Sequence, residues 1–461
     1  MDSRALVKVG AVAGLTFRSV VHSRLLVSLA VLLFCIVLAL PWLIKDDGTL
    51  SGRMEVLLQY TLVSVSFLLT LGSLWAGAAL MAGELADRRL QLVLVKPVHP
   101  FYVWCGKWIG ILGMQASLLL LAGSLCYLQL RSNMSASRAA SADSGAFAER
   151  VLVARRIVSP QPEAVDGPVR ARLAEARARG AIPNDLTDAK AYEMVEHQVR
   201  AESCVVHPGQ RRGWAFKPGA MPSQGAVLLR FRFSSSAQMD KPTVRGEWCV
   251  QADGQREPFR VTEESRAGVV QELTIPRDTF HGAQLVRVEY RNAETEVPAA
   301  VLFAAEDGPV LRIVAGGMAA NLLRALLVLL CQQALFAAIG LTMGGLFSTP
   351  VAVFASLFCM VLASMSDYVS WVVRTGVLYV THEGEIPPAT AWDAAVKMLF
   401  RLLNVVVGPL HDLDPLRSLA DGDVVGWPMV ARAALVLAGG FAGVLALVCA
   451  FVLRRRELAT S

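Results

Sequence analysis

The stretch VLLQYTLVSVSFLLTLGSLWAGAALM, from Val56 to Met81, carries no charged residue. A helix needs about 20 mostly apolar residues to cross a bilayer, so this stretch predicts a membrane span. The composition of the whole chain agrees, because 54% of its residues are hydrophobic and 18% are charged. A soluble globular chain carries about 25% charged residues. Disordered proteins, small disulfide scaffolds and ordinary cytosolic enzymes are therefore excluded.

Five other stretches have the same apolar character. They predict spans at residues 25–44, 104–130, 315–347, 351–373 and 427–453. The first has no cleavage site after it and is interpreted as an uncleaved anchor. Residues 4–22, just before it, place Lys8, Arg18 and His22 among apolar side chains and predict an amphipathic helix that lies along the headgroups; a basic flank is the alternative. The result is a mostly α-helical, polytopic membrane protein with six transmembrane helices.

Basic residues in the short flanking loops set the orientation. An even number of spans leaves both termini on one side. The basic residues of that side are Arg4, Lys8, Arg18, Arg24, Arg88, Arg89, Lys96, Arg454, Arg455 and Arg456. Because short cytoplasmic loops are enriched in Lys and Arg, we expect both termini in the cytoplasm of a cell whose inner or plasma membrane holds the protein.

A soluble domain interrupts the membrane part. Residues 131–312 contain 25 of the 44 Lys and Arg residues and 23 of the 38 Asp and Glu residues. The predicted orientation makes this insert extracytoplasmic, between a first membrane region (1–130) and a second (313–461). Its net charge of only +2 gives no reason to expect nucleic-acid binding.

The insert itself divides into two parts. Residues 131–200 predict a Ser/Ala-rich flexible linker at 132–145 and a charged helix at 167–180. Residues 201–312 contain short alternating runs separated by Gly, Pro and Asn, which favour a small β-sandwich. The runs are 226–233, 244–251, 269–275, 285–290, 300–304 and 310–314. The predicted core aromatics are Trp214, Phe216, Trp248 and Phe259.

Two cysteines, Cys204 and Cys249, lie in the insert, and the other six lie in or beside the spans. An oxidising compartment would allow these two to pair. A disulfide and two free thiols are both compatible with the sequence, since spacing supplies no geometry.

No motif in the chain predicts catalysis. The seven His residues show no metal-ligand spacing, and neither a G-x-x-x-x-G-K-[ST] loop nor a G-x-S-x-G elbow is present. We therefore expect no enzyme activity, metal or cofactor in this chain.

The predicted cytoplasmic segment 84–103 lies between the second and third spans. Residues 84–95 predict a short helix that ends before Pro97. Its polar face carries Asp87, Arg88 and Arg89, and its inner face carries Leu90, Leu92 and Val95. Such a charged element is suited to docking on a cytosolic partner, although an ordinary loop is the alternative.

These residues resemble the ABC-2 type transporter permease family. The similar features are Glu84, the run 90–95, Pro97, Tyr102, Gly106 with Lys107, and the ending 451–458 (FVLRRREL). The six spans and the amphipathic N-terminal helix are also similar, over residues 1–130 and 313–461. The insert is a departure from the short loop of simple members.

The resemblance implies a permease subunit that moves an unidentified substrate without its own ATPase. It implies a second permease chain, identical or different, and cytosolic P-loop ATPase subunits that bind ATP-Mg. Coupling to the ATPase would involve Glu84, Asp87, Arg88, Arg89, Leu92 and Pro97. The amphipathic stretch 391–406, within 381–426, resembles the outer re-entrant hairpin of the family; a surface helix is the alternative.

Lys107 and Arg432 lie near the ends of predicted spans, whereas Arg324 and Asp367 lie further inside, where ionisable residues are usually functional. Arg324 and Asp367 are candidates for a pair or for a substrate path, and snorkelling of Arg324 is the alternative. The spacings Gly340-x-x-x-Gly344 and Gly439-x-x-x-Gly443 predict close helix packing.

Two other functions remain open. The helices could only anchor a β domain that binds a partner or ligand outside the cell. Alternatively, the chain could be an ion-coupled transporter, for which Asp367 is the single intramembrane acid that the sequence offers. Loss of ATPase coupling on changing Glu84 or Arg88 would favour the permease over both.

Overall fold

The computed structural model divides into two compact units, a helical unit (Met1–Leu152 and Gly317–Ser461) and a β-rich unit (Val153–Gly316). It describes residues 3–458 with gaps. The gaps are 23, 44–49, 87–98, 141–152, 163–164, 180–187, 220–224, 237–242, 256, 281, 295–298, 305–307 and 379–390.

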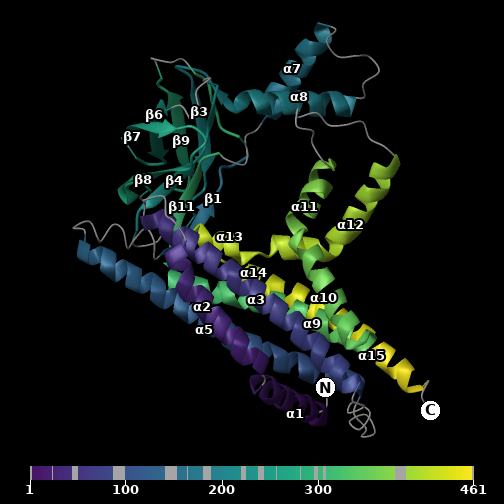
Figure 1. Ribbon diagram of the computed structural model, residues 1–461. Helices are drawn as coiled ribbons and strands as arrows, with labels where there is room; N and C mark the ends of the chain where they lie inside the picture. Colours follow the sequence, from purple (N-terminus) through teal and green to yellow (C-terminus); the bar gives the residue numbers. More distant parts are fainter. Residues whose placement is uncertain are drawn as a thin grey trace. The chain divides into compact units, whose positions relative to one another are not determined.

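The helical unit begins with α1 (Ser3–Val21), α2 (Arg24–Leu43), α3 (Leu50–Ala86) and α5 (Pro100–Ala140). After the β-rich unit it continues with α9 (Met318–Leu346), α10 (Thr349–Ser364), α11 (Ser366–Thr375), α12 (Ala391–Asp412), α13 (Pro415–Ala420), α14 (Trp427–Ala433), a π-helical turn (Ala434–Phe441) and α15 (Ala442–Leu458). Figure 1 shows α3, α5 and α9 side by side at the centre of this unit.

The described residues contain five helices that are long and apolar enough to cross a membrane. They are Leu58–Ala86, Pro100–Ser132, Met318–Leu346, Trp392–Leu419 and Trp427–Arg455. Four coincide with predicted spans. The predicted first span is α2, whose described apolar part, Val27–Leu40, is shorter than these five helices. The chain is thus a polytopic membrane protein with a separate β domain.

The predicted fifth span at 351–373 corresponds to two helices that are together long and apolar enough to cross a membrane, with a bend between them. The structure breaks it into α10 and α11, which meet at an angle of 48°. Serines flank the break at Met365, and the Ser364 hydroxyl donates a hydrogen bond to the carbonyl of Val361. Serine side chains that bond to the backbone compete with helical hydrogen bonds and bend helices.

The predicted amphipathic stretch at 391–406 is part of the longer helix α12, which packs along α11. Its apolar face is largely exposed, as Trp392 (80%) and Leu399 (62%) show. Helices α11 and α12 together form a helical hairpin, which includes residues that were predicted to belong to the fifth span. Residues 381–390 of the predicted outer hairpin lie outside the described residues.

The predicted flexible linker at 132–145 is helical as far as Ala140, because α5 continues through it. Alanine has the highest helix propensity, and an established helix extends at little cost. Residues 141–145 of the predicted linker lie outside the described residues, and the compact β-rich unit begins at Val153.

The described residues of the β-rich unit form two four-stranded sheets. One has the order β1 (Val153–Val158), β11 (Val310–Gly317), β4 (Val227–Phe231), β8 (Gln271–Ile275). The other has the order β3 (Arg211–Phe216), β9 (Val286–Asn292), β6 (Thr243–Ala252), β7 (Phe259–Arg266). A small third sheet joins β2 (Val205–Val206), β10 (Val301–Leu302) and β5 (Ser234–Ser235).

Both large sheets contribute aromatic side chains to one core, which makes the unit a β-sandwich. The ring of Trp248 lies 4.5 Å from that of Phe231 in the first sheet and 4.8 Å from that of Tyr290 on the neighbouring strand. Trp214 and Phe216 are buried, as the sequence predicted, and Phe259 is only partly buried because β7 is an edge strand.

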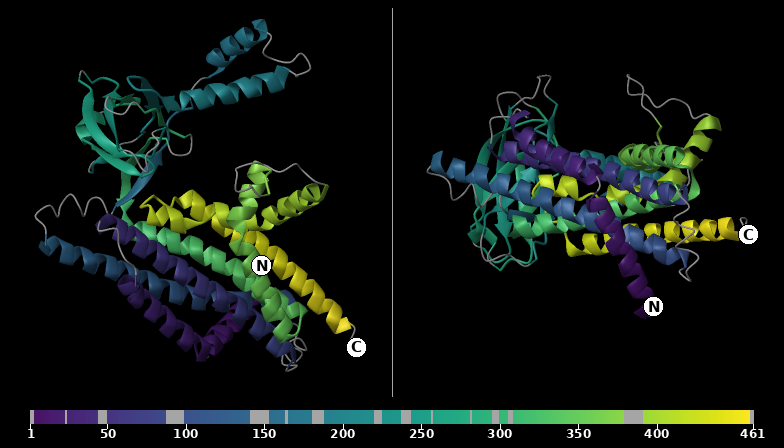
Figure 2. Two further views of the ribbon diagram at one scale, coloured as in Figure 1. Left: turned by 45° about the horizontal axis from the view of Figure 1, so that its top comes forward. Right: turned by 60° about the horizontal axis from the view of Figure 1, so that its bottom comes forward.

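Two helices accompany the sandwich and lie side by side (Figure 2). The predicted helix at 167–180 is α7 (Asp166–Ala178), and α8 (Asp188–Ser203) packs against it through Val169 and Val195. Helix α8 was not predicted. Its apolar residues Tyr192, Val195 and Val199 recur at helical spacing and could have revealed it.

The buried Tyr290 predicts a loss of stability at high pH. Burial, and secondarily the charge of Glu294, raises the pKa of its phenol above the ordinary value of 10.0. The unfolded chain therefore releases this proton at a lower pH than the folded one, so stability is fully present below about pH 10 and falls as pH rises further. We expect Tyr290→Phe to weaken this pH dependence in urea unfolding of the sandwich. An unchanged pH slope in the variant would contradict the expectation.

Candidate functional site

A hydrogen-bond network lies in the centre of the helical unit, where α3, α5 and α9 meet. The Gln115 amide donates to the hydroxyl of Ser73 (2.6 Å) and to the carbonyl of Leu69 (3.1 Å). Ser73 donates to Gln333 (3.0 Å), whose own amide donates to Thr70 (3.1 Å). These groups bond to one another because hydrocarbon offers polar side chains no other partner. The network therefore fixes the register of three helices.

Glycines bring α3 and α9 into direct backbone contact. A Cβ on Gly340 would lie 2.5 Å from the carbonyl oxygen of Leu74, and one on Gly344 would lie 2.6 Å from that of Ala78. Gly77 of α3 faces the backbone of α9 in the same way. The first predicted glycine spacing thus packs two helices, whereas a Cβ on Gly443, in the second, would meet no described atom outside its own turn of helix within 4 Å.

The N-terminal helix α1 packs on the first half of α5. Gly106 and Gly110 of α5 leave room for Val12 and Thr16 of α1, whose side chains would be less than 3 Å from an added Cβ. On its other faces α1 exposes Leu6 (56%), Val7 (72%) and Leu15 (69%). The helix is amphipathic, as predicted, and it is held against the bundle through glycines.

Glu84 and Lys107 form an ion pair that joins α3 to α5. The Lys107 side chain is 3% exposed and that of Glu84 is 36% exposed. Glu84 stands near the end of α3, and Lys107 lies in the second turn of α5. The pair therefore holds together the two helix ends from which the segment 87–98 departs.

The other predicted coupling residues, Asp87, Arg88, Arg89, Leu92 and Pro97, lie outside the described residues, which resume at His99. The structure thus brings only Glu84 of the predicted set into a defined contact. Lys107 is among the residues that resemble the family, but its pairing with Glu84 was not predicted. Opposite charges at the facing ends of two predicted spans were the signal that could have suggested this pair.

Arg324 and Asp367 do not pair with each other in the structure. Arg324 donates to the carbonyl of Ala320 in its own helix (3.2 Å). Asp367 is 77% exposed and accepts from His411 (2.6 Å), which joins α11 to α12. Of the alternatives for these two residues, a direct pair is not present in the structure, because the break at Met365 places Asp367 in the α11–α12 hairpin.

Cys204 and Cys249 are free thiols. Side chains alternate between the two faces of a strand, and Trp248 points into the core, so the adjacent Cys249 points outward. The sulfur of Cys204 lies 4.0 Å from the guanidinium of Arg212, which shares the inner face of β3 with Trp214. The two thiols are thus on opposite sides of the sheet, so the structure has the second of the two alternatives, two free thiols.

This geometry predicts that reducing agents leave the stability of the protein unchanged. We expect Cys204→Ser/Cys249→Ser to shift the free energy of unfolding by less than about 1 kcal/mol, whereas a structural disulfide contributes about 2–4 kcal/mol. Mass spectrometry after alkylation under denaturing, non-reducing conditions should find both cysteines modified. A peptide in which the two are cross-linked would contradict the expectation.

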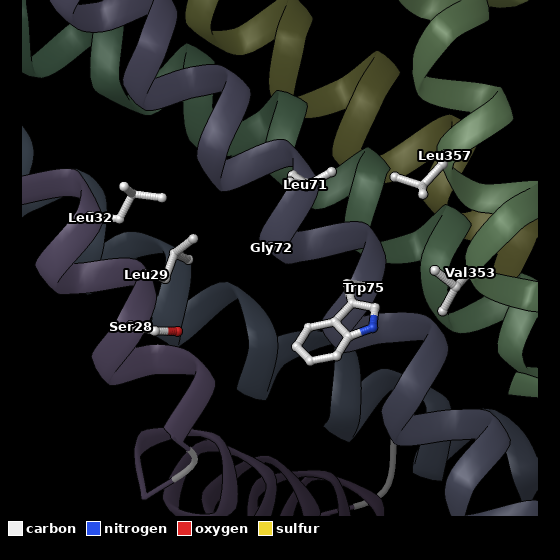
Figure 3. Close-up of a pocket in the computed structure, with 8 residues that line it drawn as sticks. All are labelled: Ser28, Leu29, Leu32, Leu71, Gly72, Trp75, Val353 and Leu357. Atoms are coloured by element: carbon white, nitrogen blue, oxygen red, sulfur yellow. The ribbon is translucent and has the colours of Figure 1, made fainter. Parts of the chain in front are cut away.

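A hollow of about 360 Å³ lies between α2, α3 and α10 (Figure 3). It is lined by Ser28, Leu29 and Leu32 of α2, Leu71, Gly72 and Trp75 of α3, and Val353 and Leu357 of α10. Pockets of this size hold small ligands. The lining is apolar apart from the Ser28 hydroxyl and the Trp75 indole, so the hollow is suited to a hydrocarbon group.

Among the described residues, no group of His, Cys, Asp or Glu could hold a metal ion. No family model, no curated protein and no solved structure matches the chain. The fold and these sites define a polytopic membrane protein that carries an inserted β-sandwich domain.

Proposed function

We propose that the chain is the permease subunit of an ABC-2 type transporter and moves its substrate with energy from a separate cytosolic ATPase. The observation that carries this proposal is the Glu84–Lys107 pair, which ties the ends of α3 and α5 on either side of the charged segment 87–98. A partner that pushes on this segment would act on two helices at once.

The packing of the bundle supports the same mechanism. α3 and α5 both join the Gln115–Ser73–Gln333 network with α9, and α3 is in backbone contact with α9 through Gly340 and Gly344. A displacement at the Glu84–Lys107 pair would therefore be transmitted along rigid helices to α9. The hollow between α2, α3 and α10 is bordered by one of these helices. Both termini and the segment 87–98 would face the cytoplasm, and the sandwich would face outward.

Affinity purification of the tagged full-length protein tests the proposal. Mass spectrometry should identify a P-loop ATPase, and the complex should hydrolyse ATP. Arg88→Ala/Arg89→Ala should lower ATPase retention at least about tenfold, because lost interfacial charge contacts cost about 2–5 kcal/mol. The matched control, Arg454→Ala/Arg455→Ala, removes two basic residues from the same predicted side and should change retention less than about twofold. Absence of any ATPase after cross-linking in intact membranes would overturn the proposal.

A second function is favoured by the sandwich itself, which has its own core and forms a separate compact unit. In this alternative the domain recognises an extracellular partner and the helices only anchor it. Deletion of residues 153–316 would then abolish activity, whereas loss of an associated ATPase would leave activity unchanged.

A further inference from the structure

The hollow between α2, α3 and α10 has two chemically different ends. Ser28, Trp75 and Val353 form one layer, and Leu32, Leu71 and Leu357 form the next layer along the three helices (Figure 3). Both polar atoms of the lining, the Ser28 hydroxyl and the Trp75 indole N–H, belong to the first layer. The second layer is purely aliphatic. An occupant with one polar end and one hydrocarbon end would match this order.

Gly72 makes the hollow possible. A Cβ at this position would lie 2.9 Å from a terminal carbon of Leu29. Any larger residue would therefore move Leu29 or fill the space between α2 and α3. Leu71 and Leu357 are partly exposed on their helices, and Leu32 (47%) and Trp75 (45%) are more so. The hollow is thus open at the side of the bundle, where lipid would enter.

A positive charge stands beside the polar end. Arg24, the first residue of α2, precedes Ser28 by one helical turn and is exposed. Residues at i and i+4 lie on the same face of a helix, so Arg24 continues the face that lines the hollow. Arginine donates paired hydrogen bonds to phosphate, and tryptophan is enriched at the headgroup level of membranes.

We propose that this hollow binds one acyl chain of an anionic membrane lipid, with its phosphate at Arg24 and Ser28 and its chain between Leu32, Leu71 and Leu357. The lipid comes from the leaflet on the side where α2 begins. The aliphatic layer excludes polar solutes, because their desolvation would go uncompensated. The proposal does not depend on the ATPase partner, so either can fail without the other.

The test uses the purified full-length protein in phosphatidylcholine vesicles that contain a phosphatidylglycerol with a photoreactive diazirine in its acyl chain. Mass spectrometry locates the labelled residues. We expect saturable labelling at Leu32, Leu71 and Leu357. Unlabelled phosphatidylglycerol should compete with the label at about fivefold lower concentration than added short-chain phosphatidylcholine does, which is the ratio expected for one basic residue near a headgroup.

Two matched pairs of variants separate this site from general lipid contact. Leu357→Trp should reduce labelling of the hollow at least about fivefold by filling it, whereas Phe358→Trp, at the adjacent position outside the lining, should not. Arg24→Gln should remove the preference for phosphatidylglycerol, and Arg18→Gln on α1 should retain it. Gel filtration confirms that each variant is folded, and the wild-type labelling is decisive even if one variant is not.

Three outcomes would overturn the proposal. The first is unsaturable label spread evenly over the exposed helices, which is the result for ordinary surrounding lipid. The second is equal competition by the two lipids. The third is that the residues of the hollow stay unlabelled and that two chains of the Leu71→Cys variant form a disulfide with each other. This result would mean that a second copy covers the hollow.

Discussion

Replacement of Glu84 by Gln is expected to destabilise the protein by about 3–5 kcal/mol, the range for an ion pair that loses one partner and leaves a buried charge. The buried charge here is that of Lys107, whose side chain is 3% exposed. Lys107→Met should cost about 1 kcal/mol or less, because the remaining Glu84 is 36% exposed and can be hydrated. The two partners of one contact should therefore behave very differently.

The prediction is checked by measuring the free energy of unfolding in one detergent for the wild type, the two single variants and the double variant. The double variant Glu84→Gln/Lys107→Met should lie within about 1 kcal/mol of the wild type, since a buried pair can be exchanged for apolar groups at little cost. Equal effects of the two single variants would show that the pair is not buried asymmetrically. Glu84→Gln should also reduce ATP hydrolysis by the proposed ATPase partner, whereas the double variant, which restores stability, reports whether the charges themselves are needed.

Gly340→Val is expected to cost about 3 kcal/mol or more. The atom that a Cβ would meet at 2.5 Å is the backbone oxygen of Leu74, which cannot rotate away as a side chain can. Helices α3 and α9 must therefore separate, and overpacking of this kind costs about 1–3 kcal/mol even for smaller insertions. Separation would also stretch the hydrogen bonds from Ser73 to Gln333 and from Gln333 to Thr70.

The matched control is Gly443→Ala, which also changes a glycine of a predicted packing motif but has no atom within 4 Å of its Cβ. It should leave the protein unchanged or stabilise it by up to about 1 kcal/mol, because alanine favours the helix. The free energy of unfolding in detergent is compared directly between Gly340→Ala and Gly443→Ala. Gly340→Val adds a larger side chain at the first position. A Gly340→Ala variant as stable as Gly443→Ala would mean that the contact between α3 and α9 is looser than the structure has it.

The sequence predicted the parts of this protein that depend on one residue's neighbours along the chain. Four spans coincide with helices of the structure, because a run of about 20 apolar residues has few alternatives to a membrane helix. The sandwich and its core tryptophans, Trp214 and Trp248, also followed from alternation along strands. Less regular segments were missed, such as the edge strand β7, whose second half is polar.

Tertiary structure decided every feature that depends on which elements face one another. Nothing in the spacing distinguishes Gly340-x-x-x-Gly344 from Gly439-x-x-x-Gly443, yet only the first lies opposite another backbone. Cys204 and Cys249 are compatible with a disulfide until the strand faces are known. The Glu84–Lys107 pair and the hollow beside Gly72 likewise join residues from separate helices. The pattern along the chain determines which segments leave water, because the free energy of transfer from water to an apolar environment is a property of each residue. Contacts between segments depend on packing in three dimensions, which pattern along the chain does not contain.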